Sequence, residues 1–274
     1  MSASSRPSGV RKNLGHRIVI GIVLAILLLP ILSTLLYALS TEWGASVLPE
    51  GLTLEWFTTL WTDPRFLLAF GRSLVLCFGT LILSIVVILP VIFLIECLYP
   101  RLEGVMNMVI MLPFAIPPVV SSVGLLQLYA QDPLPLVGTP WILVGAYFTI
   151  VLPFIYRAMV NNMRAINIPQ LMEAASLLGA SPLQTMIRVI LPNMRKGIQS
   201  AVFVSFSFLL GEFVFTNLLA GTRFETVQIY LFNLRGRSGH YTSAIVISYF
   251  AFILLFTWLA SRLGGRKGSS GETS

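Results

Sequence analysis

The stretch from Asn167 to Gln184 reads NIPQLMEAASLLGASPLQ, and it decides how the rest of the chain is interpreted. Its local chemistry predicts two short helices. Pro169 suits a first helical position, where no backbone donor is needed, and Gly179 suits the left-handed residue that ends a helix. Ser181 can cap the second helix, with Gln184 closing a capping box. We expect this second helix to run toward residue 189.

The first of these helices has a compact apolar face. Leu171, Met172, Ala175 and Leu178 recur at helical spacing and therefore share one side. Ala174 and Ala175 are small, so another surface can approach this side closely. The spacing leaves two interpretations open: the face binds a partner protein, or the helix lies on a membrane or against its own chain.

The sequence around this stretch predicts an all-α integral membrane protein. Of its 274 residues 56% are hydrophobic and 11% charged, whereas a soluble domain carries about 25% charged residues. A bilayer core needs about 20 apolar residues per helix. Six segments meet this need and predict six transmembrane helices: 18–41, 73–95, 105–131, 137–156, 197–221 and 238–261. They leave tails at 1–17 and 262–274 and a long loop at 157–196.

The distribution of basic residues predicts the orientation in the membrane. If residue 1 is cytoplasmic, thirteen of the 18 Lys and Arg residues lie in cytoplasmic segments, as the positive-inside rule requires. Both ends of the chain are then cytoplasmic, and so is the loop 157–196. The first apolar run is too long for a signal-peptide core and lacks a small-residue cleavage site, so we interpret it as a retained span.

Seven residues of the loop carry a family resemblance: Glu173, Ala174 and Ala175, then Gly179, Val189, Leu191 and Pro192. Their spacing resembles the EAA loop of binding-protein-dependent ABC importer permeases, with Val189 where the family has Ile. The resemblance implies a type I importer permease: a six-helix bundle with cytoplasmic EAA coupling helices, in a bacterial inner membrane.

The resemblance also implies a mechanism and a set of partners. The loop would dock into a separate ATPase dimer, which binds ATP and Mg, so we expect no cofactor in this chain. Further expected partners are a second homologous permease or a second copy, an extracytoplasmic solute-binding protein and membrane lipid. The expected coupling residues are Glu173, Ala174, Ala175, Gly179, Met172, Leu178, Leu191 and Pro192, with Glu173 as the docking acid and Gly179 as the turn.

Two features suggest a substrate path within the spans. Glu212 lies in the fifth span, where an ionised carboxylate costs about 2.5–3.5 kcal/mol. It either lines the path or bonds to a neighbour, such as Ser205, Ser207 or an arginine of the loop 222–241. Ser121 and Ser122 follow a proline-rich break in the third span, which either lines a cavity or merely bends the helix.

Other classes of function lack their residues. The sequence contains no phosphate-binding Gly-x-x-x-x-Gly-Lys loop and no nucleophile–base pair, so we expect no enzyme. Cys77, Cys97, His16 and His240 have no metal-ligand spacing, so we expect no metal. The basic residues are explained by topology, without nucleic acid. The alternative is a secondary transporter driven by an ion gradient, with Glu212 as its proton site, but this leaves the loop unexplained.

The transported solute is predicted only as a class. The stretches 43–56 and 132–142 resemble the polyamine and aminophosphonate importer permeases. Polyamine permeases tend to have two adjacent acids where this chain has Gly211 and Glu212. A small polar solute of one of these two classes is the expectation.

Overall fold

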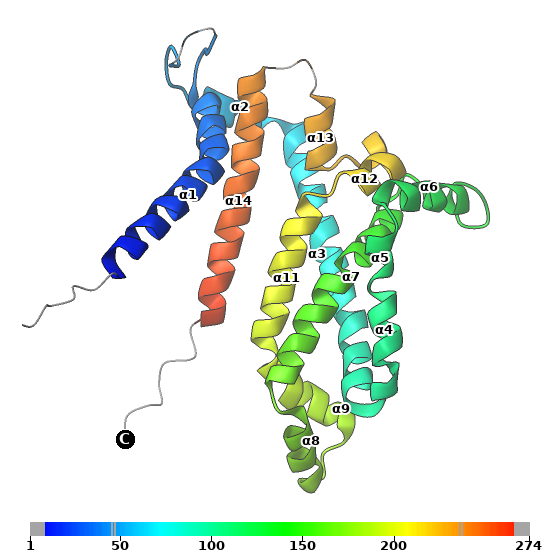
Figure 1. The fold of residues 1–274 in the computed structure, drawn as a ribbon. Helices are drawn as coiled ribbons and strands as arrows, with labels where there is room; N and C mark the ends of the chain where they lie inside the picture. Colours follow the sequence, from blue (N-terminus) through cyan, green and yellow to red (C-terminus); the bar gives the residue numbers. More distant parts are fainter. Residues whose placement is uncertain (1–8, 45, 47, 235, 237, 266–274) are drawn as a thin grey trace, which may run out of the picture. The chain divides into compact units, whose positions relative to one another are not determined.

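A computed structural model describes residues 9–44, 46, 48–234, 236 and 238–265 (Figure 1). In this part of the chain the regular structure is helical, apart from one antiparallel bridge between Ser40 and Leu52. The all-α class predicted from composition is confirmed. The chain divides into two compact units, one formed by 1–63 with 234–252 and the other by 64–233 with 253–274. Each is described by itself.

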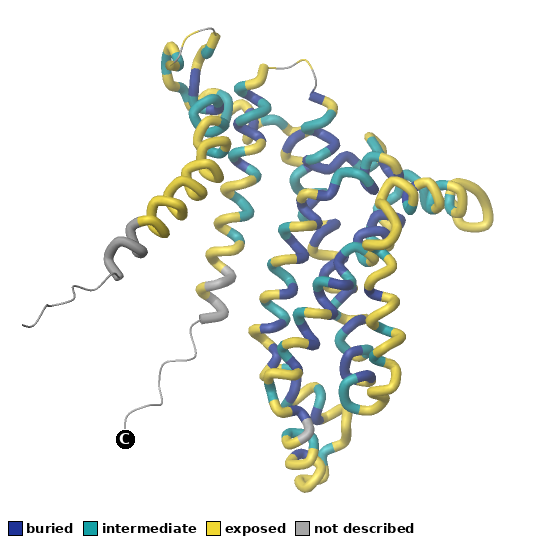
Figure 2. Tube along the Cα trace, viewed as in Figure 1, coloured by how far each residue is buried: buried dark blue, intermediate teal, exposed yellow. Residues whose placement is uncertain are grey.

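The first unit contains α1 (Gly9–Leu39), α2 (Glu55–Thr62) and the beginning of α14 (Gly239–Gly265). An aromatic cluster joins them. The ring of His240 stacks on Tyr37 at 4.1 Å and on Trp56 at 5.7 Å, and its Nδ1 donates to the carbonyl oxygen of Tyr37 at 2.8 Å. Below this cluster the apolar side chains of α1 from residue 18 to residue 32 are largely exposed (Figure 2), as lipid-facing side chains are.

The second unit is built around three helices: α3 (Pro64–Phe93), α7 (Pro140–Ala165) and α11 (Arg195–Leu210). Their facing sides are buried in Figure 2. The core side chains there are mostly large and apolar, and include Leu81, Ile88, Leu143, Val151, Ile155 and Phe206. Since every backbone group inside a helix is satisfied locally, such a bundle suits a membrane interior.

The predicted third span is sharply bent. The segment 105–131 contains α4 (Glu103–Val109), α5 (Leu112–Ala115) and α6 (Pro118–Tyr129), and the two halves meet at an angle of 95°. Ile116 at the bend is extended, with φ −109° and ψ 119°. Pro117 explains this, because the residue before a proline is pushed out of the helical region.

The predicted fifth span, 197–221, is wrong as a continuous helix. α11 ends at Leu210, and a short α12 (Val214–Leu219) follows after the break at residues 211–213. A 3-10 turn, η4 (Gly221–Phe224), and α13 (Val227–Asn233) complete the segment. This break contains no proline, and its cause lies in the side-chain contacts described below.

Among the described residues, four helices are long and apolar enough to cross a membrane, and the bent pair raises the number to five. Three of the four are α1, α7 and α14. The fourth is α3 together with the π-helical turn η1 (Leu94–Leu98), which continues α3. α11 has 16 residues and is shorter than these. The predicted count of six is therefore not confirmed. α1 begins at Gly9 and α3 at Pro64, ahead of the predicted span starts at residues 18 and 73, so both helices extend beyond the predicted spans. Residues 1–8 and 266–274 of the predicted tails lie outside the described residues.

The loop between α7 and α11 folds into short helices, as predicted. They are α8 (Ile168–Leu177), α9 (Pro182–Thr185), the π-turn η3 (Met186–Ile190) and α10 (Leu191–Asn193). The predicted capping box is confirmed: the Gln184 backbone N–H donates to Ser181 Oγ at 3.3 Å, and the Ser181 N–H donates to Gln184 Oε1 at 3.0 Å. α7 extends to Ala165, so the first part of the expected loop 157–196 is helical.

Candidate functional site

A cavity of about 580 Å³ lies where the two broken helices of the second unit meet α7. Pro117 and Ser121 line it from the first break, Thr149 from α7 and Glu212 from the second break. Among the described residues that line it, Glu212 is the one ionisable side chain. The two features that suggested a substrate path, far apart in sequence, therefore share one cavity.

Aromatic side chains form the apolar part of the cavity wall. Phe114 and Phe208 line it from α5 and α11. The ring of Phe154 in α7 lies between them, with its centroid 5.8 Å from that of Phe114 and 5.1 Å from that of Phe208. Such ring pairs stabilise beyond the area they bury, so the three helices hold one another around the cavity.

The carboxylate of Glu212 caps the short helix α12. Its Oε1 accepts the backbone N–H of Phe215 at 2.7 Å. Its Oε2 accepts the backbone N–H and the hydroxyl of Thr216, at 3.2 and 3.1 Å. The first N–H groups of a helix have no partner within the helix, and an anion is favoured beside them. The suggested partners Ser205 and Ser207 are not among these donors. The donors, Phe215 and Thr216, lie three and four residues after Glu212 in the same segment.

Tyr147 connects this cap to α7. Its hydroxyl lies 2.7 Å from Thr216 Oγ1, and it is the donor there because the Thr216 hydroxyl donates to Glu212. Both side chains are buried. Tyr147 was not predicted from the sequence, because a single tyrosine in an apolar run carries no pattern that distinguishes it from a packing residue.

The two serines after the first break differ in position. Ser121 lines the cavity, whereas Ser122 is fully buried and its Oγ donates to the carbonyl of Pro118 at 2.8 Å within α6. The expected contribution of Ser122 to a substrate path is therefore corrected: its hydroxyl is used inside its own helix.

The α7–α11 loop ends its first helix as predicted. Gly179 has φ +77°, its N–H donates to the carbonyl of Ser176, and the Ala180 N–H donates to that of Ala175. This pair of bonds is the Schellman motif, in which glycine is favoured because it has no Cβ. The turn directs the chain from α8 into α9.

The structure corrects which side of α8 is free. Ala175, expected at the centre of a docking face, is 7% exposed and lies with Ile168 on the side that faces its own chain. Leu177 and Leu178 are each 88% exposed. Leu178 was expected on the docking face and is accessible, whereas Leu177 was missed because its position falls outside the predicted stripe.

The other expected coupling residues are divided between surface and interior. Glu173 and Ala174 are exposed on α8, and Met172 is half-buried. Pro192 is exposed, whereas Leu191 lines a small apolar gap together with Leu89 of α3. Leu191 therefore anchors the loop to the bundle.

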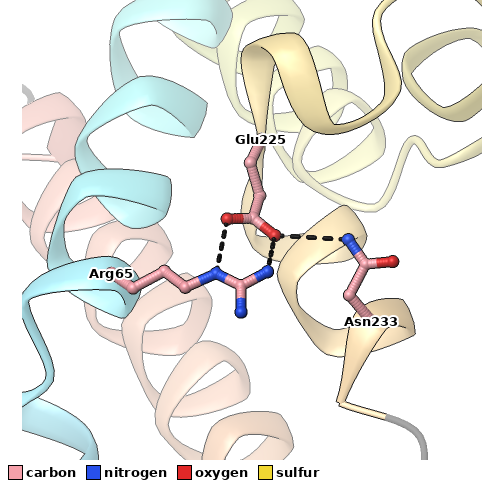
Figure 3. Close-up of polar contacts among 3 residues, drawn as sticks. All are labelled: Arg65, Glu225 and Asn233. Atoms are coloured by element: carbon pink, nitrogen blue, oxygen red, sulfur yellow. Dashed lines mark hydrogen bonds and ion pairs between the residues drawn. The ribbon is translucent and has the colours of Figure 1, made fainter.

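A charged cluster holds the segment after the second break to the start of α3. Arg65 donates from Nε and Nη2 to the two carboxylate oxygens of Glu225, at 2.9 and 2.6 Å (Figure 3). Asn233 Nδ2 also donates to Glu225, at 3.3 Å. Nearby, Ser73 Oγ accepts the Val227 N–H at 2.9 Å. These bonds join η4 and α13 to α3.

The environment of Glu225 favours its ionised form. Burial raises the pKa of this carboxyl group, but the hydrogen bonds from Arg65 and Asn233 and the charges of Arg65 and Arg72 outweigh burial. The pKa of Glu225 is therefore held below its usual value. We name Arg65, Glu225 and Asn233 the Arg65 cluster.

Residues 98–268 match the family described as binding-protein-dependent transport system inner membrane component. The match covers more than half of the chain. The chain belongs to this family. It is thus a multi-pass permease subunit of the ABC importer class and not itself an enzyme.

Two curated relatives of this permease have different named solutes. The permease is 28% identical over 243 residues to PhnV of Salmonella typhimurium (strain LT2), named as a 2-aminoethylphosphonate transport system permease, covering 88% of this chain and 90% of the relative. It is 29% identical over 144 residues to the spermidine/putrescine transport system permease PotB of Salmonella typhimurium (strain SL1344), covering 51% and 50%.

A solved structure shares the fold of this permease. It is a bacterial ABC transporter that imports the acidic polysaccharide alginate, with a TM-score of 0.71 at 14% identity, covering 95% of this chain and 99% of that one. A bacterial alginate ABC transporter solved in complex with an alginate-bound periplasmic protein gives a TM-score of 0.70 at 18% identity, covering 95% of this chain and 97% of that one. At such identities the likeness supports the fold alone.

Proposed function

We propose that this permease crosses the membrane six times and forms half of a translocation path that a separate ATPase drives. In this proposal the bent α4–α6 and the broken α11–α12 each make one crossing, in addition to α1, α3, α7 and α14. Broken helices at membrane depth are tolerated where they line a cavity. The observation that carries the proposal is the cavity of about 580 Å³ that both breaks line.

The α7–α11 loop would be the docking element for the ATPase, which binds ATP and Mg. Its support is the pair Leu177 and Leu178, each 88% exposed at the end of α8, a helix whose buried side includes Ala175. A rigid apolar knob of this kind buries well in a partner's groove, as the central residues of interfaces do. Glu173 and Ala174 would border the contact.

The loop would lie in the cytoplasm, with both ends of the chain on the same side. This orientation rests on the basic residues, thirteen of 18 of which fall on that side. A cysteine replacing Glu50, in a chain whose Cys77 and Cys97 are serines, should react with a membrane-impermeant thiol reagent only from outside. Reaction only from the cytoplasm would show that the orientation is the opposite of the proposed one.

The remaining partners follow from the family. We propose a second homologous permease or a second copy, which would complete the path, and an extracytoplasmic binding protein that delivers the solute. The alginate transporter, which has been solved with its periplasmic protein, supports the latter.

The solute would be small and polar, with aminophosphonates favoured over polyamines. The first relative is matched over 88% of this chain and the second over 51%. The cavity itself does not select a solute by its charge. Among its described lining residues no side chain is basic, and the one acid is occupied as a helix cap. Uptake of 2-aminoethylphosphonate and of spermidine, measured side by side in proteoliposomes, would separate the two classes.

The docking proposal is tested by purification of the complex. Leu178→Arg should lose the ATPase, because burying an unpaired charge costs several kcal/mol, and about 8 kcal/mol corresponds to micromolar affinity. Leu102→Arg is a matched control, since Leu102 is also an exposed leucine but lies in the turn η2 (Pro100–Leu102). Retention of the ATPase by Leu178→Arg at the level of the control would refute docking through this face.

A further inference from the structure

A second charged cluster lies at the other end of α3, where α7 leads into the loop. Arg164 in the last turn of α7 donates from Nε to Glu96 Oε2 at 3.0 Å and from Nη2 to Glu96 Oε1 at 2.8 Å. The same Nη2 lies 2.8 Å from Glu103 Oε1. One guanidinium therefore binds two carboxylates, and we name the three residues the Arg164 cluster.

The geometry of this cluster is directional. A bidentate guanidinium–carboxylate pair fixes orientation as well as distance, which a single contact does not. The Glu96 side chain is 14% exposed, whereas those of Arg164 and Glu103 are 50% and 41% exposed, so the cluster lies at the surface with Glu96 on its inner side. Glu103 also stands at the start of α4, where a negative charge favours the helix.

Each member of the cluster belongs to a different functional part of the second unit. Arg164 precedes α8, the helix of the proposed docking knob, by one short extended link at Ile166. Glu103 begins α4, which continues into α5 and the bend at Ile116 that lines the cavity. Glu96 lies in η1, the turn that follows the long helix α3.

The far end of the loop is fastened to the same part of α7. Gly197 near the start of α11 packs so closely against Asn162 that a Cβ there would collide with the Asn162 side chain. Asn162 lies on α7 just before Arg164. Both ends of the loop are thus fixed to the last turns of α7, and movement of the loop acts on α7 there.

We propose that Arg164, Glu96 and Glu103 are positioning residues that transmit movement of the loop, through α4, to the cavity wall formed by α5 and α6. This inference rests on the proposed docking of the loop. η1 and η2, which connect α3 to α4, are short and irregular, so the Arg164 cluster provides a direct side-chain link between α7 and α4. When the docked loop moves, α4 moves with it and the bend at Ile116 shifts beside the cavity.

The test in the assembled transporter uses a reporter in the cavity and no solute. Ser121→Cys is introduced into a chain whose Cys77 and Cys97 are serines, and its rate of maleimide labelling is compared without nucleotide and with ATP plus vanadate. With Arg164 intact we expect the two rates to differ about tenfold, a typical coupling between sites. With Arg164→Gln the difference should fall below about twofold, while the ATPase stays bound.

Two further variants separate the link from a general loss of charge. Arg157→Gln removes the same charge from an exposed position of α7 that forms no ion pair with a described residue, and it should respond like the unaltered chain. Arg164→Lys keeps the charge but cannot hold two carboxylates in a fork, so it should restore the response in part. A full response in Arg164→Gln would overturn the proposal.

A measurement on the chain alone decides the link even if the loop does not dock. Amide hydrogen exchange of the purified permease in nanodiscs should become faster by about fivefold or more in both α4 and α8 for Arg164→Gln, and in neither for Arg157→Gln. Unchanged exchange in α4 would show that the cluster does not hold this helix. If only the docking proposal fails, Arg164→Gln should still show the expected faster exchange in α4 and α8, but the permease would not bind the ATPase.

Discussion

The two helix breaks around the cavity have different causes. At Ile116 the chain leaves the helical region because Pro117 follows, and this restriction is a steric clash with the adjacent proline ring. At residues 211–213 no proline is present, and the new helix α12 begins because Glu212 satisfies its first N–H groups. The first break is local and belongs to the chain itself, whereas the second depends on a charged side chain and on Thr216 and Tyr147. We therefore expect substitutions to affect the second break more.

The largest effect is expected for Glu212→Ala. It leaves the N–H groups of Phe215 and Thr216 without their acceptor at a buried position, which should lower the free energy of unfolding by about 3 kcal/mol. Thermal unfolding in detergent measures this. Ser207→Ala, which changes another residue of the cavity lining, is the control and should stay within about 0.5 kcal/mol. A Glu212→Ala protein as stable as this control would show that the cap is not what starts α12.

Glu212→Gln separates the cap from the charge. The amide keeps one acceptor oxygen, so the loss of stability should be about half as large, near 1.5 kcal/mol. If the charge also serves the path, uptake should fall while the ATPase remains bound. Wild-type uptake in this variant would leave Glu212 with a structural role alone.

The next effect is expected where α7 supports the second break. Tyr147→Phe removes one buried hydrogen bond and Thr216→Val removes two, so unfolding should become easier by about 1 and 2 kcal/mol, respectively. A double-mutant cycle measures their coupling. Because both changes remove the same 2.7 Å bond, the double variant should cost less than the sum. Strict additivity would mean that the two hydroxyls do not interact.

A smaller effect is expected at the first break. Pro117→Ala frees the backbone of Ile116 and also increases the freedom of the unfolded chain, which costs about 0.5–1 kcal/mol. The bend itself should become less sharp, since Pro118 can remain as a first helical residue of α6. Spin labels placed in α4 and α6 should report a broader distance distribution. An unchanged, narrow distribution would show that tertiary packing and not Pro117 holds the bend.

The smallest effect concerns the Arg65 cluster, which anchors the segment after the second break. The pKa of Glu225 is lowered in the folded protein, so its contribution is present above the carboxyl's unfolded pKa and is lost as the pH falls through the lower, folded value. Since the Arg65 side chain is 52% exposed, the loss should be about 1 kcal/mol or less. Thermal unfolding from pH 6 to pH 3 measures it, and Glu225→Gln should flatten that dependence. An equally steep decline in Glu225→Gln would assign the acid sensitivity to other carboxyl groups.

Much of this protein follows from local sequence alone. The apolar segments predicted a helical membrane protein, and the EAA-like spacing predicted the family, because both depend on residues close together in the chain. The capping box at Ser181 and the left-handed Gly179 were predicted for the same reason. So was the proline-rich break in the third span, although whether it lines a cavity or only bends the helix was left open.

Tertiary structure decided what depends on residues far apart in sequence. The cavity joins Ser121 to Glu212, and the cap of α12 reaches Tyr147. The buried side of α8 is set by the parts of the chain against which it packs, so Ala175 lies inside and Leu177 outside. Helical periodicity gives the angle between side chains on one helix but not the direction of its neighbours. Composition likewise shows that a carboxylate in an apolar segment must find donors, and only the folded chain decides which ones.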